Sequence, residues 1–178
     1  SMCGIAGWLG EKINADTCAE ILTRLTHRGP DGSGQWSTNG VWLGHRRLAV
    51  LDLSSQGDQP MVSSSRQLIL TYNGEIYNYV ELRAELKRNG VYFHGESDTE
   101  VVLAACEYWG IETAVSRFEG MFSFAIYNVN KRILWLVRDP MGIKPLYYAN
   151  VGSEFAFASE LTALQPLTWL DDTINADA

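Results

Sequence analysis

The sequence lacks the features that mark several large classes of protein. No apolar run approaches the roughly 18–20 residues needed to cross a bilayer, so no membrane span is expected. Lysine and arginine number 14 against 21 aspartates and glutamates, which gives a net charge of −7. This acidic balance argues against a nucleic-acid-binding or anionic-membrane surface.

Cysteine and histidine are also scarce. Cys3, Cys18 and Cys106 form no CxxC pair, and an odd cysteine count favours a reducing compartment such as the cytoplasm over a disulfide framework. The three histidines show no ligand spacing with one another or with the cysteines. Neither a metal nor another cofactor is therefore expected in this domain.

The remaining composition describes an ordinary globular domain. With 178 residues, of which 46% are hydrophobic and 20% charged, one domain with a substantial core is expected. The apolar patterns predict strands and helices along the whole chain. The predicted strands cover 4–9, 34–37, 41–50, 67–72, 121–128, 132–138, 146–150 and 154–158, and the predicted helices cover 15–25, 80–88 and 98–109. Hairpins outnumber crossovers, which predicts an α+β fold with two largely antiparallel sheets.

The most informative residue is Cys3, which follows only Ser1 and Met2. Ser1 resembles a cloning remnant, and an initiator methionine is normally removed when the next residue is small. A mature chain beginning at Cys3 would carry a thiol and an α-amine on one residue. Because an α-amine titrates at about 7.7–8.0, it can act as the base for its own thiol. The alternative is that a cysteine stands here without a function.

Two other positions combine polar groups in a way that suits catalysis or binding. The predicted strand 67–72 ends at Asn73-Gly74, where an Asn amide and a Gly N–H can point together as an oxyanion hole, although Asn-Gly is also a common turn. Arg47, in a strand-like stretch, can pair bidentately with a carboxylate or simply face solvent.

Asp98 opens a predicted helix directly after Ser97. Ser97 and Glu100 have the spacing of a capping box, which gives the local carboxylates a structural explanation. Asp98 could equally bind an ammonium group. The turn-rich loop 27–32, His-Arg-Gly-Pro-Asp-Gly, is either a connector or part of a site.

Motifs in the right order along nearly the whole chain carry a family resemblance. They are Cys3-Gly4-Ile5, His27–Asp31, Gly44–Leu48 through Asp52-Leu53, Gln59-Pro60, Tyr72–Asn78, Ser97–Glu100, Phe118–Phe122, Arg138-Asp139, Lys144–Tyr147 and Phe157–Glu160. The chain resembles the class II glutamine amidotransferase domain of N-terminal nucleophile hydrolases, in the asparagine synthetase branch. The resemblance implies a four-layer αββα sandwich of two mainly antiparallel sheets.

The same resemblance implies a catalytic apparatus. Cys3, assisted by its own α-amine, would attack the side-chain amide of L-glutamine, releasing glutamate and ammonia. Asn73 and the Gly74 N–H would stabilise the tetrahedral oxyanion. If Ser1-Met2 stay attached, Cys3 lacks its amine and the protein is expected to be inactive while still able to bind.

It also implies the substrate contacts. Arg47 would hold the α-carboxylate, Asp98 with Glu75 would hold the α-ammonium, and the backbone at Val50 and Leu51 would line the pocket. Two further readings stay open: a catalytically silent glutamine-binding or scaffold domain, and an amidotransferase that serves a sugar acid or another carboxylate instead of aspartate.

The resemblance finally predicts a larger architecture. Residues 1–2 would be a tag remnant and initiator methionine, 3–165 the amidotransferase domain, and 166–178 the start of a linker. The expected partner is a C-terminal synthetase domain that uses ATP and Mg²⁺, and whose Ser-Gly-Gly-x-Asp-Ser-type phosphate loop does not occur in these 178 residues. A cytoplasmic location is expected, and a homodimer is left open.

Overall fold

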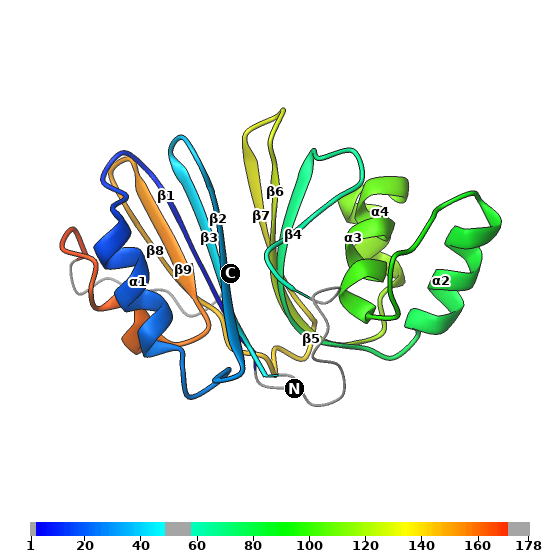
Figure 1. The fold of residues 1–178 in the computed structure, drawn as a ribbon, viewed down its shortest axis with the longest axis horizontal. Coiled ribbons are helices and arrows are strands. Elements are labelled where there is room, and N and C mark those ends of the chain that lie inside the picture. Colours follow the sequence, from blue (N-terminus) through cyan, green and yellow to red (C-terminus); the bar gives the residue numbers. More distant parts are fainter. Residues whose placement is uncertain (1–2, 49–57, 171–178) are drawn as a thin grey trace.

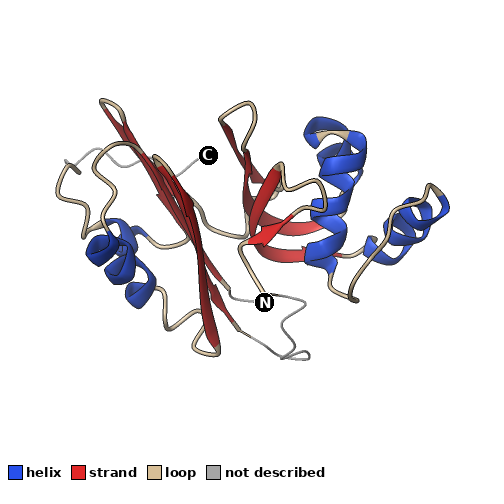
Figure 2. Ribbon diagram, turned by 45° about the horizontal axis from the view of Figure 1, so that its top comes forward, coloured by secondary structure: helices blue, strands red, loops and turns tan. Residues whose placement is uncertain are grey.

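The computed structural model describes residues 3–48 and 58–170, which form two β-sheets facing each other with helices on their outer sides (Figure 1). A rotated view shows the same succession of helix, sheet, sheet and helix (Figure 2). The α+β class and the four-layer αββα arrangement are thus confirmed. Within the described part of the chain, no helix has both the length and the apolar character needed to cross a membrane.

The first sheet has the strand order β2-β3-β1-β9-β8, and all neighbours are antiparallel. Its strands are β1 Gly4–Leu9, β2 Gly32–Thr38, β3 Val41–Arg47, β8 Tyr147–Val151 and β9 Glu154–Ala158. The β2–β3 hairpin turns at Asn39-Gly40 as expected, because Gly40 adopts a φ of 78° that favours glycine. Strand β1 lies at the centre of this sheet, between β3 and β9, and Cys3 directly precedes it.

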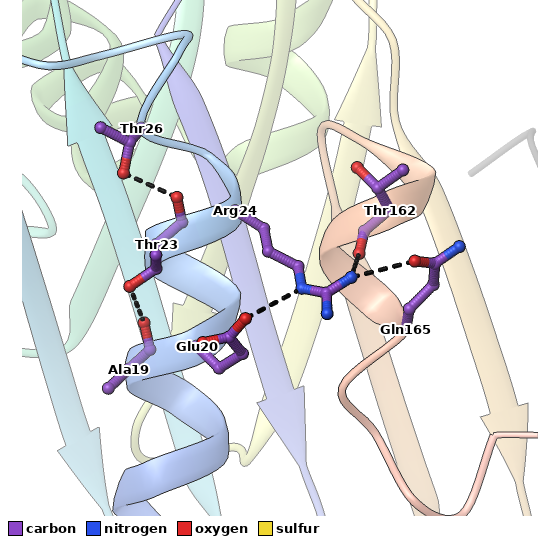
Figure 3. A network of polar contacts seen from close by, with 7 residues as sticks. All are labelled: Ala19, Glu20, Thr23, Arg24, Thr26, Thr162 and Gln165. Atoms are coloured by element: carbon purple, nitrogen blue, oxygen red, sulfur yellow. Dashed lines mark hydrogen bonds and ion pairs between the residues drawn. The ribbon is translucent and has the colours of Figure 1, made fainter.

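The outer face of this sheet is covered by α1 (Ala15–Arg24) and the short 3₁₀ helix η2 (Leu161–Leu164). Helix α1 begins at Asn14, whose side chain accepts a hydrogen bond from the Thr17 N–H. Arg24 at its other end donates to Glu20 on its own helix and to the Thr162 carbonyl and the Gln165 side chain (Figure 3). The arginine therefore joins the two segments that cover the sheet.

The second sheet has the order β4-β5-β6-β7, again antiparallel throughout. Its strands are β4 Met61–Val62, β5 Leu68–Ile76, β6 Gly120–Asn128 and β7 Ile133–Arg138. The helices on its outer side are α2 Tyr79–Arg88, α3 Asp98–Trp109 and α4 Ile111–Arg117. Helix α3 packs on β5, and α2 and α4 pack against α3.

The inner faces of the two sheets meet in an apolar layer. Its fully buried members come from β1, β3, β5, β6 and β9: Ile5, Leu43, Ile69, Ala125 and Phe157. Their positions follow the two-residue period of a strand, since the alternate residues Ala6, Trp8 and Trp42 pack under α1. This alternation decides which polar residues at the strand ends face the space between the sheets.

The largest error in a predicted boundary concerns the end of one strand. The strand predicted over 67–72 does not end at Asn73-Gly74, because β5 continues to Ile76 and pairs along its whole length with β6. Gly74 remains in the ladder with a φ of 157°, and a Cβ there would lie 2.3 Å from the Met121 carbonyl oxygen. The glycine therefore permits a close approach of β6 where the sequence suggested a turn.

Three short elements were not predicted: β4, α4 and η2. Each has two to seven residues, too few for an apolar period to emerge. Their structure depends on partners, as β4 pairs with β5 and α4 packs on α3. The part of the predicted strand 41–50 that follows Leu48 lies outside the described residues.

The close approach of β5 and β6 can be tested at Gly120, where a Cβ would lie 1.9 Å from the Glu75 carbonyl oxygen. Gly120→Ala should lower the free energy of unfolding by at least about 3 kcal/mol, because backbone cannot move aside as a side chain can. Gly152→Ala is the matched control, with a φ of 60° but nothing within 4 Å of the new Cβ, and should cost about 1 kcal/mol. Urea unfolding measures both, and equal losses would contradict the close packing.

Candidate functional site

Cys3 directly precedes the central strand of the first sheet. Gly4 pairs with Arg46 in the antiparallel register of β1 and β3, so Cys3 lies at the level of Arg47. Its thiol is free of any disulfide and the residue is 9% exposed. Because Ile5 belongs to the layer between the sheets, the two-residue period places Cys3 on the same inner face.

Two hydrogen bonds between the sheets bring Asn73 to the same end of the molecule. The Thr71 hydroxyl donates to the Gly44 carbonyl at 3.0 Å, and His45 Nε2 lies 3.2 Å from the Tyr72 carbonyl oxygen. Strands β3 and β5, which belong to the two facing sheets, therefore lie opposite each other and run in the same direction at this point. Continuing both strands places Asn73 and Gly74 level with Arg46 and Arg47, at the end of β1 that carries Cys3.

The His45 imidazole is neutral at ordinary pH. Burial, with a smaller effect of the positive charge of Arg47, lowers the pKa of His45 to about 4, although the Tyr72 carbonyl acts in the opposite direction. At neutral pH the ring has one N–H, which must lie on Nε2 for the contact to be a hydrogen bond. His45 thus acts as a neutral cross-sheet donor.

Asn73 is the most unusual group at this end of the sheets. It is completely buried, and neither its Oδ1 nor its Nδ2 has a hydrogen-bond partner among the residues that the structure describes. It shares the inner face with Ile69 and Thr71, the face that looks toward β1 and β3. Leaving a buried polar group unpaired costs about 1–3 kcal/mol, so the amide is poised for a ligand.

Asp98 is positioned at the first residue of α3, on the outer side of β5. Its Oδ2 accepts hydrogen bonds from the Tyr72 hydroxyl at 2.9 Å and from the Ile76 N–H at 3.4 Å. The predicted cap is also present, since the Glu100 N–H donates to the Ser97 hydroxyl. The Glu100 carboxylate, however, accepts from the N–H groups of His94 and Gly95. Ser97 therefore caps the helix, and the Asp98 carboxylate also accepts hydrogen bonds from the backbone N–H groups of Thr99 and of Asp98 itself.

Tyr72 connects Asp98 to the rest of the site. Burial, followed by the negative charges of Asp98, Glu75 and Cys3, raises the pKa of Tyr72 well above its ordinary value. The phenol thus stays protonated and donates to Asp98. Asp98 and Glu75, predicted to hold the α-ammonium, and Cys3, the predicted nucleophile, all lie close enough to influence this one hydroxyl, although Glu75 itself is exposed.

Burial also raises the pKa of Asp98 above its ordinary value, although hydrogen bonds from Tyr72 and the Ile76 N–H act in the opposite direction. The ionised carboxylate is therefore less stable here than in water. A bound cation would offset that cost, which is the behaviour expected of an ammonium-binding group.

Arg47 ends β3 and faces a different carboxylate in this structure. Its Nη1 donates to Asp58 Oδ1 at 2.8 Å. The Asp58 side chain is 63% exposed, and an exposed pair of this kind contributes only about 0–1 kcal/mol. A substrate carboxylate could compete for the guanidinium. The predicted pocket residues Val50 and Leu51 lie outside the described residues.

The turn-rich loop 27–31 lies beside Arg47. Pro30 forms an isolated bridge with Arg47, and the Asp31 N–H donates to the Arg47 carbonyl. His27 and Arg28 both contact the Glu160 carboxylate. Burial alone would raise the pKa of Glu160, but the hydrogen bonds and charges of these two side chains lower it below its ordinary value. The loop is thus anchored at the edge of the candidate site.

Sequence reasoning missed two groups at this site. The sequence pattern gives no role to the Tyr72 hydroxyl beyond its place in a motif, and none to the Ser123 hydroxyl. Ser123 pairs with Asn73 in the β5–β6 register, is fully buried, and has no hydrogen-bond partner in the described part of the chain. Strand alternation gives the signal, because Ser123 interrupts an otherwise apolar inner face on β6.

The fold and the candidate site agree with one protein family, whose model covers almost the whole chain. A family model described as a glutamine amidotransferase domain matches residues 2–178. The chain belongs to this glutamine amidotransferase family, with the fold of the N-terminal nucleophile amidotransferases.

Its curated relatives are asparagine synthetases. The chain is 41% identical over 92% of its length to "Asparagine synthetase [glutamine-hydrolyzing] 1" of Bacillus subtilis, of which it covers 26%. It is 39% identical over 92% of its length to the maize asparagine synthetase, of which it covers 28%. A putative asparagine synthetase of Methanocaldococcus jannaschii is 35% identical, with 99% of this chain and 38% of the relative covered. The chain thus spans between about a quarter and two fifths of the length of these relatives.

Solved structures show the same fold at lower identity. The glutamine phosphoribosylpyrophosphate amidotransferase of B. subtilis superimposes with a TM-score of 0.80 at 24% identity, covering 92% of this chain and 43% of that one. A second structure, titled as the allosteric regulatory enzyme of purine biosynthesis, gives a TM-score of 0.82 at the same identity and coverage.

The role of Asp98 can be tested with Asp98→Asn. Because burial raises the pKa of Asp98, the native state favours the protonated form, and stability is lost as pH rises through the native pKa. At neutral pH the amide should therefore leave the melting temperature unchanged or raise it, while glutamine affinity should fall more than tenfold. Calorimetric titration and thermal melting measure the two effects. A lower melting temperature with unchanged affinity would remove Asp98 from the site.

Proposed function

We propose that this chain is a glutaminase domain that hydrolyses L-glutamine to glutamate and ammonia, with Cys3 as the nucleophile. The observation that carries the proposal is the buried Asn73 amide, which lacks a partner among the described residues and lies at the level of Cys3 between the sheets. Membership of the glutamine amidotransferase family supports it.

The proposed chemistry begins with the free N-terminus of Cys3. Its α-amine takes the thiol proton, and the sulfur bonds to the side-chain amide carbon of glutamine. The electron pair of the carbonyl moves to oxygen, where the Asn73 Nδ2–H and the Gly74 N–H stabilise the charge. The amide nitrogen takes the proton and leaves as ammonia, giving a thioester. Water then attacks the thioester, which releases glutamate and regenerates the thiol.

The same proposal assigns the two charged ends of the substrate. The Arg47 guanidinium would pair with the α-carboxylate, displacing the exposed Asp58. Asp98 would pair with the α-ammonium, together with Glu75, while Tyr72 and the Ile76 N–H hold the Asp98 carboxylate in place. Val50 and Leu51 would supply backbone to the pocket wall.

We further propose that the ammonia serves a synthetase domain on the same chain. The curated relatives named as glutamine-hydrolysing asparagine synthetases are much longer than this sequence, which supports a second domain. That domain would bind ATP and Mg²⁺ and activate the acceptor carboxylate, with aspartate as the expected acceptor. No cofactor is required by the glutaminase chemistry itself, and a cytoplasmic location suits the free thiol.

The nucleophile is tested by removing Ser1-Met2 and measuring ammonia release from glutamine. The trimmed protein should be active, and the form that keeps both residues should be inactive because Cys3 then has an amide nitrogen. Cys3→Ala in the trimmed protein should abolish turnover, and Cys3→Ser should leave little, since a hydroxyl is a far weaker nucleophile than a thiolate. Retained turnover in Cys3→Ala would overturn the mechanism.

A pair of variants separates catalysis from binding. Asn73→Ala should lower kcat by about 10²–10³-fold, the usual loss for one oxyanion donor, with little change in KM. Arg47→Ala should instead raise KM steeply, because it removes a contact made equally in the ground and transition states. Steady-state kinetics on the trimmed protein measures both. If the two variants changed kcat and KM alike, the assigned roles would be wrong.

A further inference from the structure

The segment that leads into Asp98 is held by a buried arginine on another helix. Arg83 lies on α2 and is only 8% exposed, which is rare for this residue type. Its guanidinium lies between two aromatic rings, 5.5 Å from the centre of Tyr79 and 5.7 Å from that of Phe93. Tyr79 is one turn earlier on the same helix, and Phe93 belongs to the segment between α2 and α3. Cation–π contacts with the two rings hold the guanidinium in place.

The two ends of that guanidinium contact the residues just before Asp98. Nη2 donates to the Ser97 carbonyl at 3.3 Å, and Nη1 donates to Glu96 Oε2 at 2.8 Å. Ser97 is the N-cap of α3 and Asp98 is its first residue. The arginine therefore fixes the backbone one residue away from the candidate ammonium-binding carboxylate.

Stability alone gives a poor account of this arrangement. The Glu96 side chain is 88% exposed, so its ion pair with Arg83 contributes only about 0–1 kcal/mol. Arg83 Nε is buried without a hydrogen-bond partner among the described residues, which is a cost. An apolar side chain of similar length would fill the space between the rings without that cost. What it could not provide is a donor to the Ser97 carbonyl.

Asp98 is thus held from two sides. From the sheet, the Tyr72 hydroxyl and the Ile76 N–H fix its carboxylate. From the helical layer, Arg83 fixes its backbone. A carboxylate that binds a cation needs both its oxygen atoms and its backbone fixed. In a precisely built site, a displacement of about 1 Å can lower the rate up to 100-fold.

We propose that Arg83 is a positioning residue for substrate binding, which sets the start of α3 so that Asp98 meets the α-ammonium of glutamine. The inference rests on the proposed function. It adds a residue on α2, a helix that carries none of the other candidate groups, to the apparatus that selects an amino acid over its desamino analogue.

The test compares two substrates in the trimmed protein: glutamine, and 4-carbamoylbutanoate, which has the same amide and carboxylate but no α-ammonium. Arg83→Met should raise KM for glutamine by about tenfold or more, with kcat changed less than about threefold. The KM for 4-carbamoylbutanoate should not change, because that substrate makes no contact with Asp98. Arg83→Lys, which can make one of the two contacts, should give a smaller rise and serves if the methionine variant folds poorly.

Two controls isolate the Ser97 contact. Arg88→Met removes an exposed arginine from the same helix, and Glu96→Gln removes only the exposed ion-pair partner; both should leave KM for glutamine unchanged. In an Asp98→Asn background, Arg83→Met should have no further effect on KM, because the two residues act on one contact. An equal rise in KM for both substrates, or a full additional loss in the Asp98→Asn background, would overturn the proposal. An unmodified trimmed protein without glutaminase activity would instead overturn the proposed function.

Discussion

The candidate site depends on how the two sheets are fixed against each other along the strand direction. Apolar packing between Ile5, Leu43, Ile69 and Phe157 holds the sheets together, but it is non-directional and tolerates a slide. The Thr71–Gly44 and His45–Tyr72 hydrogen bonds are directional. A slide of the sheets by one residue, about 3.3 Å, would move Asn73 away from the level of Cys3.

His45 shows why these bonds suit the interior. A charged imidazole would cost much more to bury, and its low pKa keeps it neutral throughout the physiological range. Arg47 carries the charge at the end of the same strand, where its guanidinium pairs with the exposed Asp58 carboxylate. The strand therefore changes from a neutral donor to a charged, paired side chain within two residues.

The sequence predicted the regular elements well because their patterns are long. Helix 98–109 and strand 154–158 match the structure at both ends, since Ser97, the hairpin turn before Glu154 and the apolar periods all indicate the same boundaries. Asn73-Gly74 misled for a physical reason: the same two residues favour a turn in isolation and a close strand approach when β6 lies beside them. Only the tertiary partner distinguishes the two conformations.

The candidate site was predictable where the chemistry of one residue suffices and not where a partner from a distant segment is needed. Cys3 and Asn73 could be named as candidates from residue type and local context, each beside a structural alternative. Tyr72, Ser123 and Arg83 are ordinary in sequence, and their significance comes from contacts: a phenol beside Asp98, a hydroxyl in register with Asn73, and a guanidinium on the Ser97 carbonyl. Such contacts depend on register and on helix packing, which no local pattern encodes.

Asp98 illustrates how stability and binding are balanced in this arrangement. Ser97 caps the helix, and burial disfavours the charge of Asp98, although hydrogen bonds from Tyr72 and from backbone N–H groups offset part of that cost. Tyr72, Ile76 and Arg83 nevertheless fix the side chain and its backbone. Hydrogen bonds offset only part of the cost of burying the Asp98 charge, and several groups hold the carboxylate in one orientation; such a group is suited to a bound cation, whose positive charge would offset the rest.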